Sequence, residues 1–195
     1  MKYNPEKHHR RSIHLKGYDY SQQGGYYMTI VTQNRECLFG DLVDGEMVLN
    51  DAGTMIEKWY FELENKFPDI QCDEYVIMPN HFHAVIHNVG VDLRVCPMKK
   101  LGEHNSVEHH SGKHHSGKHA GSPLRKIVQW FKTMTTNEYI RMVKQNEWQP
   151  FNGKLWQRNY WEHVIRDENE LNHIREYILN NQLQWELDDE NPKRL

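Results

Sequence analysis

The feature that most constrains the fold is the stretch 75–87, in which two apolar runs flank the dipeptide Pro79-Asn80. Proline and asparagine favour turns, so the stretch predicts two short strands joined by a tight turn. Side chains alternate faces along a strand, which places His81 and His83 together and Phe82 on the opposite face. Two imidazoles about 7 Å apart on one sheet face can share a metal ion. Taken alone, such a pair is more often two ordinary strand histidines.

Length and composition predict a single domain spanning 1–195. A chain of 195 residues can bury a sizeable core, and no apolar run approaches the roughly 20 residues of a membrane span. The N-terminus lacks the apolar segment of a signal peptide. The three cysteines are widely spaced, which favours a reducing cytoplasmic location over a disulfide framework. The formal net charge of −3 means that any role in binding nucleic acid depends on local patches.

The hydrophobic periodicity predicts the order strand, helix, strand, strand, helix, strand, helix. This order is the split βαβ, ferredoxin-like arrangement, an α+β fold with an antiparallel sheet and helices packed on one face. Asp44-Gly45 predicts the turn of an additional small hairpin. The expected main elements are a strand at 26–32, a helix capped by Asn50 or Asp51 and closed by Pro68, strands at 70–78 and 81–88, a helix starting at Ser122-Pro123, a strand at 156–165, and a last helix capped by Asp167.

Residues 91–121 interrupt the pattern with a low-complexity sequence rich in histidine and glycine. Ser111-Gly112-Lys113-His114 recurs as Ser116-Gly117-Lys118-His119, with few apolar residues around the two copies. Such a segment buries too little surface to order itself. We expect a mobile insertion at a position that the fold tolerates.

Two polar residues of the last helix, Tyr177 and Asn181, lie one turn apart at the edge of its apolar stripe. On its own, Tyr177 is more often a packing tyrosine, and Asn181 a residue that ends the helix. Their interest comes from the element order, because in the split βαβ arrangement the helices pack against the sheet, and residues at the edge of the apolar stripe can face it and remain accessible.

Several motifs resemble those of the single-tyrosine HUH transposases, and within them the REP-associated tyrosine transposases of bacteria. The resemblance covers nearly the whole chain, and the paired histidines and the late tyrosine are specific only in combination. The matching stretches are Leu15-Lys16-Gly17-Tyr18-Asp19-Tyr20, Thr32-Gln33-Asn34-Arg35, Leu49-Asn50-Asp51-Ala52-Gly53, Met78-Pro79-Asn80-His81-Phe82-His83, Val128-Gln129-Trp130-Phe131-Lys132, 156–166, Arg175-Glu176-Tyr177-Ile178 and Asn180-Asn181.

The resemblance implies roles for four residues. His81 and His83 would bind a divalent cation, Mg²⁺ or Mn²⁺, and Asn181 would complete the metal site. Tyr177 would be the nucleophile that joins the 5′-phosphate end of single-stranded DNA beside a hairpin such as a REP element. The implied activity is metal-dependent DNA cleavage and rejoining in transposition or REP-element mobility, without a small-molecule cofactor. Arg10, Arg11, Lys16 and Arg158 are the cations we expect to contact phosphates.

Two other functions stay open at this stage. A zinc-dependent hydrolase would use His81, His83 and a third histidine such as His87 or His163. A non-catalytic single-stranded nucleic-acid-binding module would use the sheet and its aromatic residues, with no role for Tyr177 or metal. The sequence leaves open whether the protein is a monomer or a homodimer.

Overall fold

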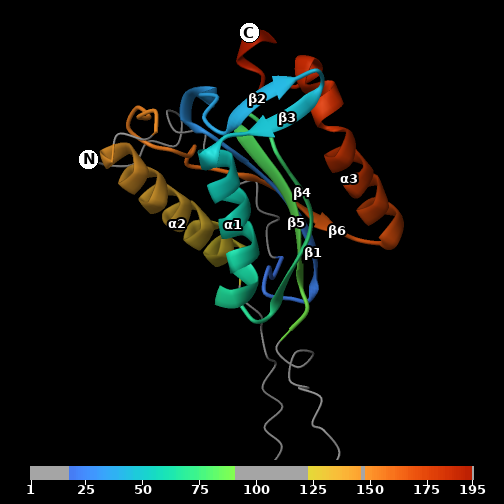
Figure 1. Ribbon diagram of the computed structural model, residues 1–195. Coiled ribbons are helices and arrows are strands. Elements are labelled where there is room, and N and C mark those ends of the chain that lie inside the picture. The colour runs from blue at the N-terminus through green and yellow to red at the C-terminus, as the bar shows by residue number, and fades with distance from the viewer. Residues whose placement is uncertain (1–17, 91–122, 146–147, 195) are drawn as a thin grey trace, which may run out of the picture.

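A four-stranded antiparallel sheet is the centre of an α+β domain (Figure 1). The structure, a computed structural model, describes residues 18–90, 123–145 and 148–194. The strand order is β4-β5-β1-β6, with every neighbouring pair antiparallel, which is the expected ferredoxin-like order. The strands are β1 (Gly24–Val31), β4 (Ile70–Ile77), β5 (His81–Asn88) and β6 (Trp161–Ile165), and a separate hairpin consists of β2 (Gly40–Val43) and β3 (Glu46–Leu49).

The helices lie on both faces of the sheet. α1 (Asp51–Lys66) and α2 (Leu124–Lys144) cover one face, and α3 (Glu168–Asn180) lies over the other, against β4 and β5 (Figure 1). The expectation that the helices pack on one face therefore holds for two of the three and is wrong for α3. The described chain also contains the short 3-10 helices η1 (Gln33–Arg35), η3 (Gln182–Leu187) and η4 (Pro192–Arg194).

Strand alternation gives each face of the sheet its own core. Phe82, Ala84 and Ile86 of β5 point into the larger core beneath α1 and α2. Val85 points the other way, into a smaller core. The buried members of this smaller core are Tyr27, Val76, Met78, Val85, Leu171 and Ile178.

Local signals read from the sequence account for most element boundaries. The side chain of Asn50 caps α1 by accepting a hydrogen bond from the Gly53 backbone N–H. Asp44 and Gly45 both adopt positive φ angles, 53° and 85°, as a two-residue hairpin turn requires. Asp167 caps α3 by accepting from the Glu170 N–H.

Several boundaries differ from the expectations; β1, for example, spans Gly24–Val31 and not 26–32. β6 begins at Trp161, because Trp156 makes only an isolated bridge to Thr32. α2 begins at Leu124, with Pro123 at the capping position. α3 ends at Asn180, so Asn181, which was expected on the last helix, lies directly after it.

Several expectations fall on parts of the chain that the structure does not describe. Arg10, Arg11 and Lys16 lie outside the described residues, and so does the expected insertion at 91–121. Among the described helices, none combines the length and the hydropathy needed to cross a membrane.

A charged network fastens α3 to the sheet. Arg175 of α3 donates to both carboxylate oxygens of Asp73 on β4, at 3.0 and 2.6 Å. His87 Nε2 lies 2.5 Å from the same carboxylate, whose side chain is 11% exposed. Burial by itself raises the pKa of Asp73, but the hydrogen bonds from Arg175 and His87 outweigh it and lower the pKa below its ordinary value.

We expect Asp73→Asn to lower the free energy of unfolding by about 1–3 kcal/mol near neutral pH, because Arg175 loses its charged partner. A carboxyl with a lowered pKa contributes stability above its unfolded pKa of about 3.9, and loses it as the pH falls through the folded value. The difference between wild type and variant should therefore narrow as the pH falls below about 4.

Urea unfolding at a series of pH values measures this difference. Asp41→Asn, at an exposed position on β2, is the matched control and should change little. An Asp73→Asn effect that stays constant at every pH would contradict the assignment.

Candidate active site

His81 and His83 lie at the start of β5, in the middle of the sheet, and point toward the face that α3 covers. Their rings are 4.6 Å apart between centroids, and the residues are 0% and 4% exposed. The antiparallel register places His83 opposite Thr29 of β1. The two imidazoles that the sequence placed on one strand face therefore share a buried position.

Hydrogen bonds fix the orientation of the His81 ring. Asn80 Nδ2 donates to the backbone carbonyls of Arg35 and Glu190, at 3.1 and 2.7 Å, so its Oδ1 is directed elsewhere. This Oδ1 lies 2.9 Å from His81 Nδ1. Because a carboxamide oxygen can only accept, Nδ1 carries the proton and Nε2 keeps its lone pair.

Two hydroxyl groups of β1 hold the ring of His83. Tyr27 Oη lies 2.7 Å and Thr29 Oγ1 lies 2.8 Å from His83 Nδ1. Each hydroxyl can accept the Nδ1 proton or donate to the Nδ1 lone pair. In the tautomer with the proton on Nδ1, Nε2 keeps its lone pair and can bind a metal ion. The Tyr27 ring also stacks on the His83 ring, with centroids 5.6 Å apart. Sequence reasoning missed this role of Tyr27 and Thr29, because it depends on which strand pairs with β5.

Three buried polar atoms at this position have no hydrogen-bond partner among the described residues: Nε2 of His81, Nε2 of His83 and Oδ1 of Asn181. Asn181 directly follows α3, keeps helical backbone angles and is 1% exposed. Leaving a buried polar atom unsatisfied costs about 1–3 kcal/mol. A group of buried nitrogen and oxygen atoms without hydrogen-bond partners is the arrangement expected where a ligand such as a metal ion binds.

Burial keeps both histidines neutral. It lowers the pKa of His81 to about 4, with a partly opposing effect from the charge of Glu190 and from contact with Asn181. Burial also lowers the pKa of His83 well below its ordinary value, and proximity to His81 adds to this effect. A neutral imidazole is the form that binds a metal ion.

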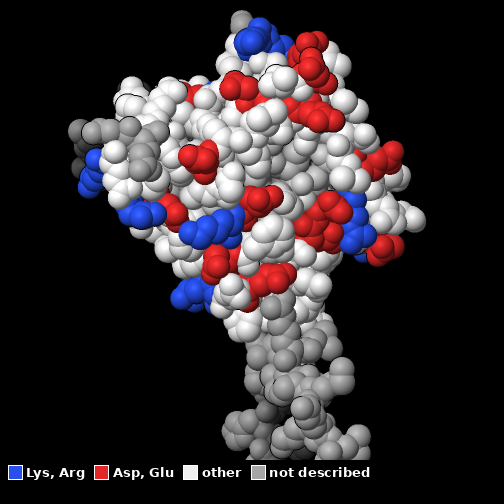
Figure 2. All heavy atoms as spheres, viewed as in Figure 1, with Lys and Arg blue, Asp and Glu red and all other residues white. Residues whose placement is uncertain are grey.

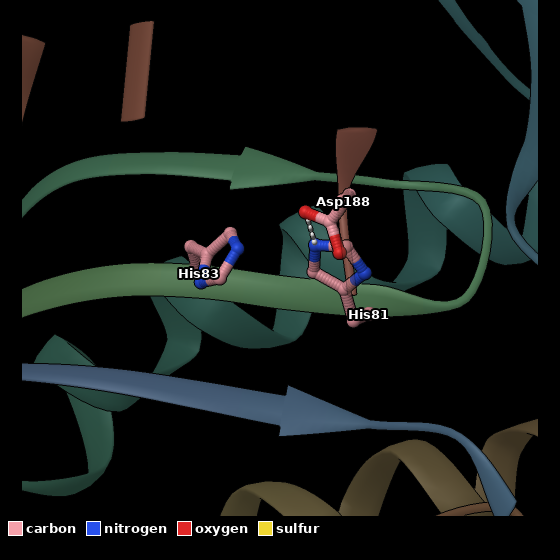
Figure 3. Close-up of side chains that lie close together, drawn as sticks. All are labelled: His81, His83 and Asp188. Carbon is pink, nitrogen blue, oxygen red and sulfur yellow. Dashed lines mark ion pairs between the residues drawn. The ribbon is translucent and has the colours of Figure 1, made fainter. Parts of the chain in front are cut away.

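Asp188 is a further member of the site that sequence reasoning missed. Candidate ligand atoms of His81, His83 and Asp188 all lie within 4.8 Å of one another, and Asp188 Oδ2 lies 3.8 Å from His81 Nε2. Figure 3 shows the Asp188 carboxylate beside the His81 ring, with His83 on the same strand. Asp188 follows η3 in an acidic run, Asp188-Asp189-Glu190, whose position over the sheet has no local signal.

Tyr177 lies at the open side of this cluster. Its ring is 5.6 Å from the ring of His83 and 6.3 Å from that of Tyr27, and the residue is 40% exposed. Partial burial raises the pKa of Tyr177, as does the charge of Asp188, while hydrogen bonding with Asn181 and Tyr27 lowers it in part. The net shift is upward, so the phenol is neutral at physiological pH.

The other candidate residues lie elsewhere. His87 is bound to Asp73, and His163 lies 2.6 Å from Glu170. Among the described residues, the group that could hold a metal ion consists of His81, His83 and Asp188. The third residue is therefore Asp188 and not the histidine expected for a zinc hydrolase. Arg158 is exposed and lines a cleft beside α2.

Comparisons with known proteins give one close relative in sequence. No family model matches the chain. An uncharacterised protein of Haemophilus influenzae is 37% identical over 199 residues, which cover 96% of each chain.

Two solved structures are more distant. The structure of a REP-associated tyrosine transposase bound to a REP hairpin covers 88% of this chain and 73% of that one, with a TM-score of 0.47 and 18% identity. A crystal structure described as that of a transposase from Deinococcus radiodurans R1 covers 87% of this chain and 98% of that one, with a TM-score of 0.42 and 14% identity.

We expect Asn181→Ala to weaken Mn²⁺ binding by at least about tenfold, because the substitution removes one of the unsatisfied donor atoms. His81→Ala should weaken binding at least as much. Electron paramagnetic resonance of free Mn²⁺ in a titration measures the affinity.

Asn180→Ala is the matched control for this experiment, since its side chain donates to the Glu176 carbonyl and not into the cluster. Equal affinities for the Asn180 and Asn181 variants would exclude Asn181 as a ligand.

Proposed function

The chain belongs to one family with the uncharacterised Haemophilus influenzae protein, and we propose that it is a metal-dependent transferase of single-stranded DNA with Tyr177 as its nucleophile. The observation that carries the proposal is the convergence of Tyr177, His81, His83 and Asn181 on one face of the sheet. These four residues come from two segments almost a hundred residues apart, and their side-chain types match those of the tyrosine transposases that the sequence resembles.

The donor atoms fit a divalent cation. His81, His83 and Asn181 would hold it through two nitrogens and one oxygen, with the carboxylate of Asp188 beside them. Imidazole ligands suit Mn²⁺ better than Mg²⁺, which prefers oxygen. When bound, the ion supplies positive charge that polarises the scissile phosphate.

Tyr177 performs the covalent step in this proposal. Its phenolic oxygen forms a bond to phosphorus as the bond from phosphorus to the 3′-oxygen breaks. The departing 3′-oxygen takes up a proton, so the products are a 5′-phosphotyrosine and a free 3′-hydroxyl. Because Tyr177 is 40% exposed, the proton that its phenol loses can pass directly to water.

Tyrosine as nucleophile has a consequence that water would not have. The phosphotyrosine link retains a phosphodiester bond, so the 3′-hydroxyl of another strand can attack it and release the tyrosine. Cutting and rejoining then need no external energy source. This chemistry suits the transposition or REP-element mobility of the resembling family, with a hairpin-bearing single strand as substrate.

Tyr27 acts as a positioning residue in the same mechanism. Its hydroxyl contacts His83 Nδ1, and its ring lies 6.3 Å from the ring of Tyr177, edge to face. One side chain thus orients a metal-binding imidazole and the attacking phenol together, in the way that outer partners of metal ligands generally act.

A metal-dependent hydrolase is the second candidate, and the position of Asp188 favours it. Two histidines and a carboxylate are also the protein ligands of several zinc hydrolases. This candidate predicts tightly bound zinc, water as the nucleophile and no covalent link between protein and DNA.

We expect the protein, mixed with hairpin-bearing single-stranded DNA and Mn²⁺, to form a covalent adduct that survives a denaturing gel. Tyr177→Phe and a chelator should each abolish the adduct, because the first removes the nucleophilic oxygen and the second the ion. Tyr75→Phe is the matched control and should retain the adduct, since the Tyr75 hydroxyl donates to Glu57 on the face of the sheet that α1 covers. Cleavage that persists in Tyr177→Phe without any adduct would support the hydrolase instead.

We expect Tyr27→Phe to slow adduct formation by about 10–100-fold, the usual effect of removing a partner that orients a metal ligand. Single-turnover rates at saturating DNA measure the effect apart from substrate binding. Tyr26→Phe is the control on the same strand, because its hydroxyl donates to the Gln22 carbonyl on the opposite face. Equal rates for the Tyr27 variant and wild type would exclude the positioning role.

A further inference from the structure

A cleft of about 830 Å³ runs between α2 and the segment 151–160 that leads into β6. Residues at helical spacing on α2, from Arg125 to Ile140, form one wall, which corresponds to a length of about 22 Å. The cleft lies beside α2, whereas Tyr177 lies on the opposite face of the sheet. It is therefore separate from the candidate active site.

The charge of this cleft is of one sign. Its charged lining residues are Arg125, Lys132, Lys154 and Arg158, and among the described residues no Asp or Glu lines it. The chain as a whole has a net charge of −3. In the view of Figure 2, most of the basic side chains lie next to acidic ones. A cleft whose charged lining residues are all basic, in a chain of negative net charge, indicates an anionic ligand.

Lys132 stabilises the wall that faces α2. Its ammonium group donates to the backbone carbonyls of Gln157 and Asn159, at 2.9 and 3.0 Å, and lies 5.4 Å from the centre of the Tyr160 ring. Burial lowers the pKa of Lys132 to about 8. Lys132 thus holds the segment in place, while Lys154 and Arg158 remain exposed at the cleft.

Neighbouring residues along the chain lead from the cleft to the candidate active site. Arg158 and Tyr160 line the cleft, and Trp161, the next residue, begins β6. Trp161 pairs with Thr29 and therefore points toward the active-site face. Its ring lies 5.4 Å from that of Tyr27, and the residue is 48% exposed. Trp161 and Arg158 are three residues apart, which is at most about 10 Å along an extended protein backbone. A DNA strand that passes from Tyr177 over Trp161 is therefore close to Arg158.

We propose that this cleft binds the phosphodiester backbone of single-stranded DNA, with Trp161 stacking on a base between the cleft and Tyr177. Exposed cations beside an exposed aromatic ring are the usual means of binding single strands without base-specific contacts. The inference rests on the proposed function, because it describes the path of the strand that Tyr177 cuts.

The test measures binding separately from cleavage. Fluorescence anisotropy of a labelled oligothymidylate with the full-length protein, in the presence of a chelator, gives the affinity as a function of salt concentration. The double variant Lys154→Glu/Arg158→Glu should bind at least about tenfold more weakly. For this variant, the slope of log K against the logarithm of the salt concentration should become shallower by about 1.4, the value for two lost phosphate contacts on single-stranded DNA.

The matched control is Lys126→Glu/Lys144→Glu, which makes the same change of charge on α2 at exposed positions outside the cleft lining. It should keep the wild-type salt slope and lose less than about twofold in affinity. Lys154→Arg/Arg158→Lys should bind like wild type, and thermal unfolding should show that all variants fold. Trp161→Ala should weaken binding without changing the salt slope, because stacking releases no counterions.

Three results would overturn the proposal. Equal losses in the cleft and control variants would show a non-specific charge effect, and unchanged binding in the cleft variant would place the strand elsewhere. Competition by polyglutamate or duplex DNA as strong as by unlabelled oligothymidylate would show a different ligand class. The binding assay needs no cleavage, so it tests the cleft separately from Tyr177. If the cleft variant loses binding but wild type forms no covalent adduct, the role of Tyr177 is refuted and the assignment of the cleft stands.

Discussion

The antiparallel pairing of β5 with β1, in one register, is the constraint on which the site depends. It places His83 opposite Thr29 and brings the Tyr27 and Thr29 hydroxyls to the same imidazole. A slip of one residue would exchange the faces of β5, sending both histidines into the larger core and Phe82 out of it. The apolar residues that alternate with the histidines therefore fix the position of the site as well as the stability of the sheet.

The position of α3 brings Tyr177 and Asn181 to the histidines that the pairing of β5 with β1 has placed. Leu171 and Ile178 pack onto the sheet, and Arg175 binds Asp73 at its edge. The same helix presents Tyr177, half exposed, and leads into Asn181, which is fully buried. Covering the histidines removes them from water and keeps them neutral, which is the protonation state that a metal site requires. The buried polar atoms that lack hydrogen-bond partners lower the stability of the fold locally, and the packing around them compensates for this loss.

β6 connects the basic cleft with the face of the sheet that carries His83 and Tyr177. Residues just before it line the basic cleft with α2, and its first residue, Trp161, stands beside Tyr27 on the other face. Strand alternation thus lets adjacent residues serve opposite faces of one thin sheet. A short edge strand is well suited to this role, because a bound chain can pass around it without crossing the core.

The sequence by itself determined the elements and the contents of each face. Period-two alternation put His81 and His83 together, helical spacing put Tyr177 and Asn181 one turn apart, and Asn50 and Asp44-Gly45 marked a helix start and a turn. These are properties of neighbours along the chain, which local stereochemistry fixes. The order of the elements indicated the ferredoxin-like sheet.

Only the tertiary structure decided that α3 lies opposite α1 and α2, that Tyr27 holds His83, and that Asp188 approaches His81. These contacts join segments separated by tens of residues. They depend on which buried surfaces match in shape, and no periodicity in the sequence records that match.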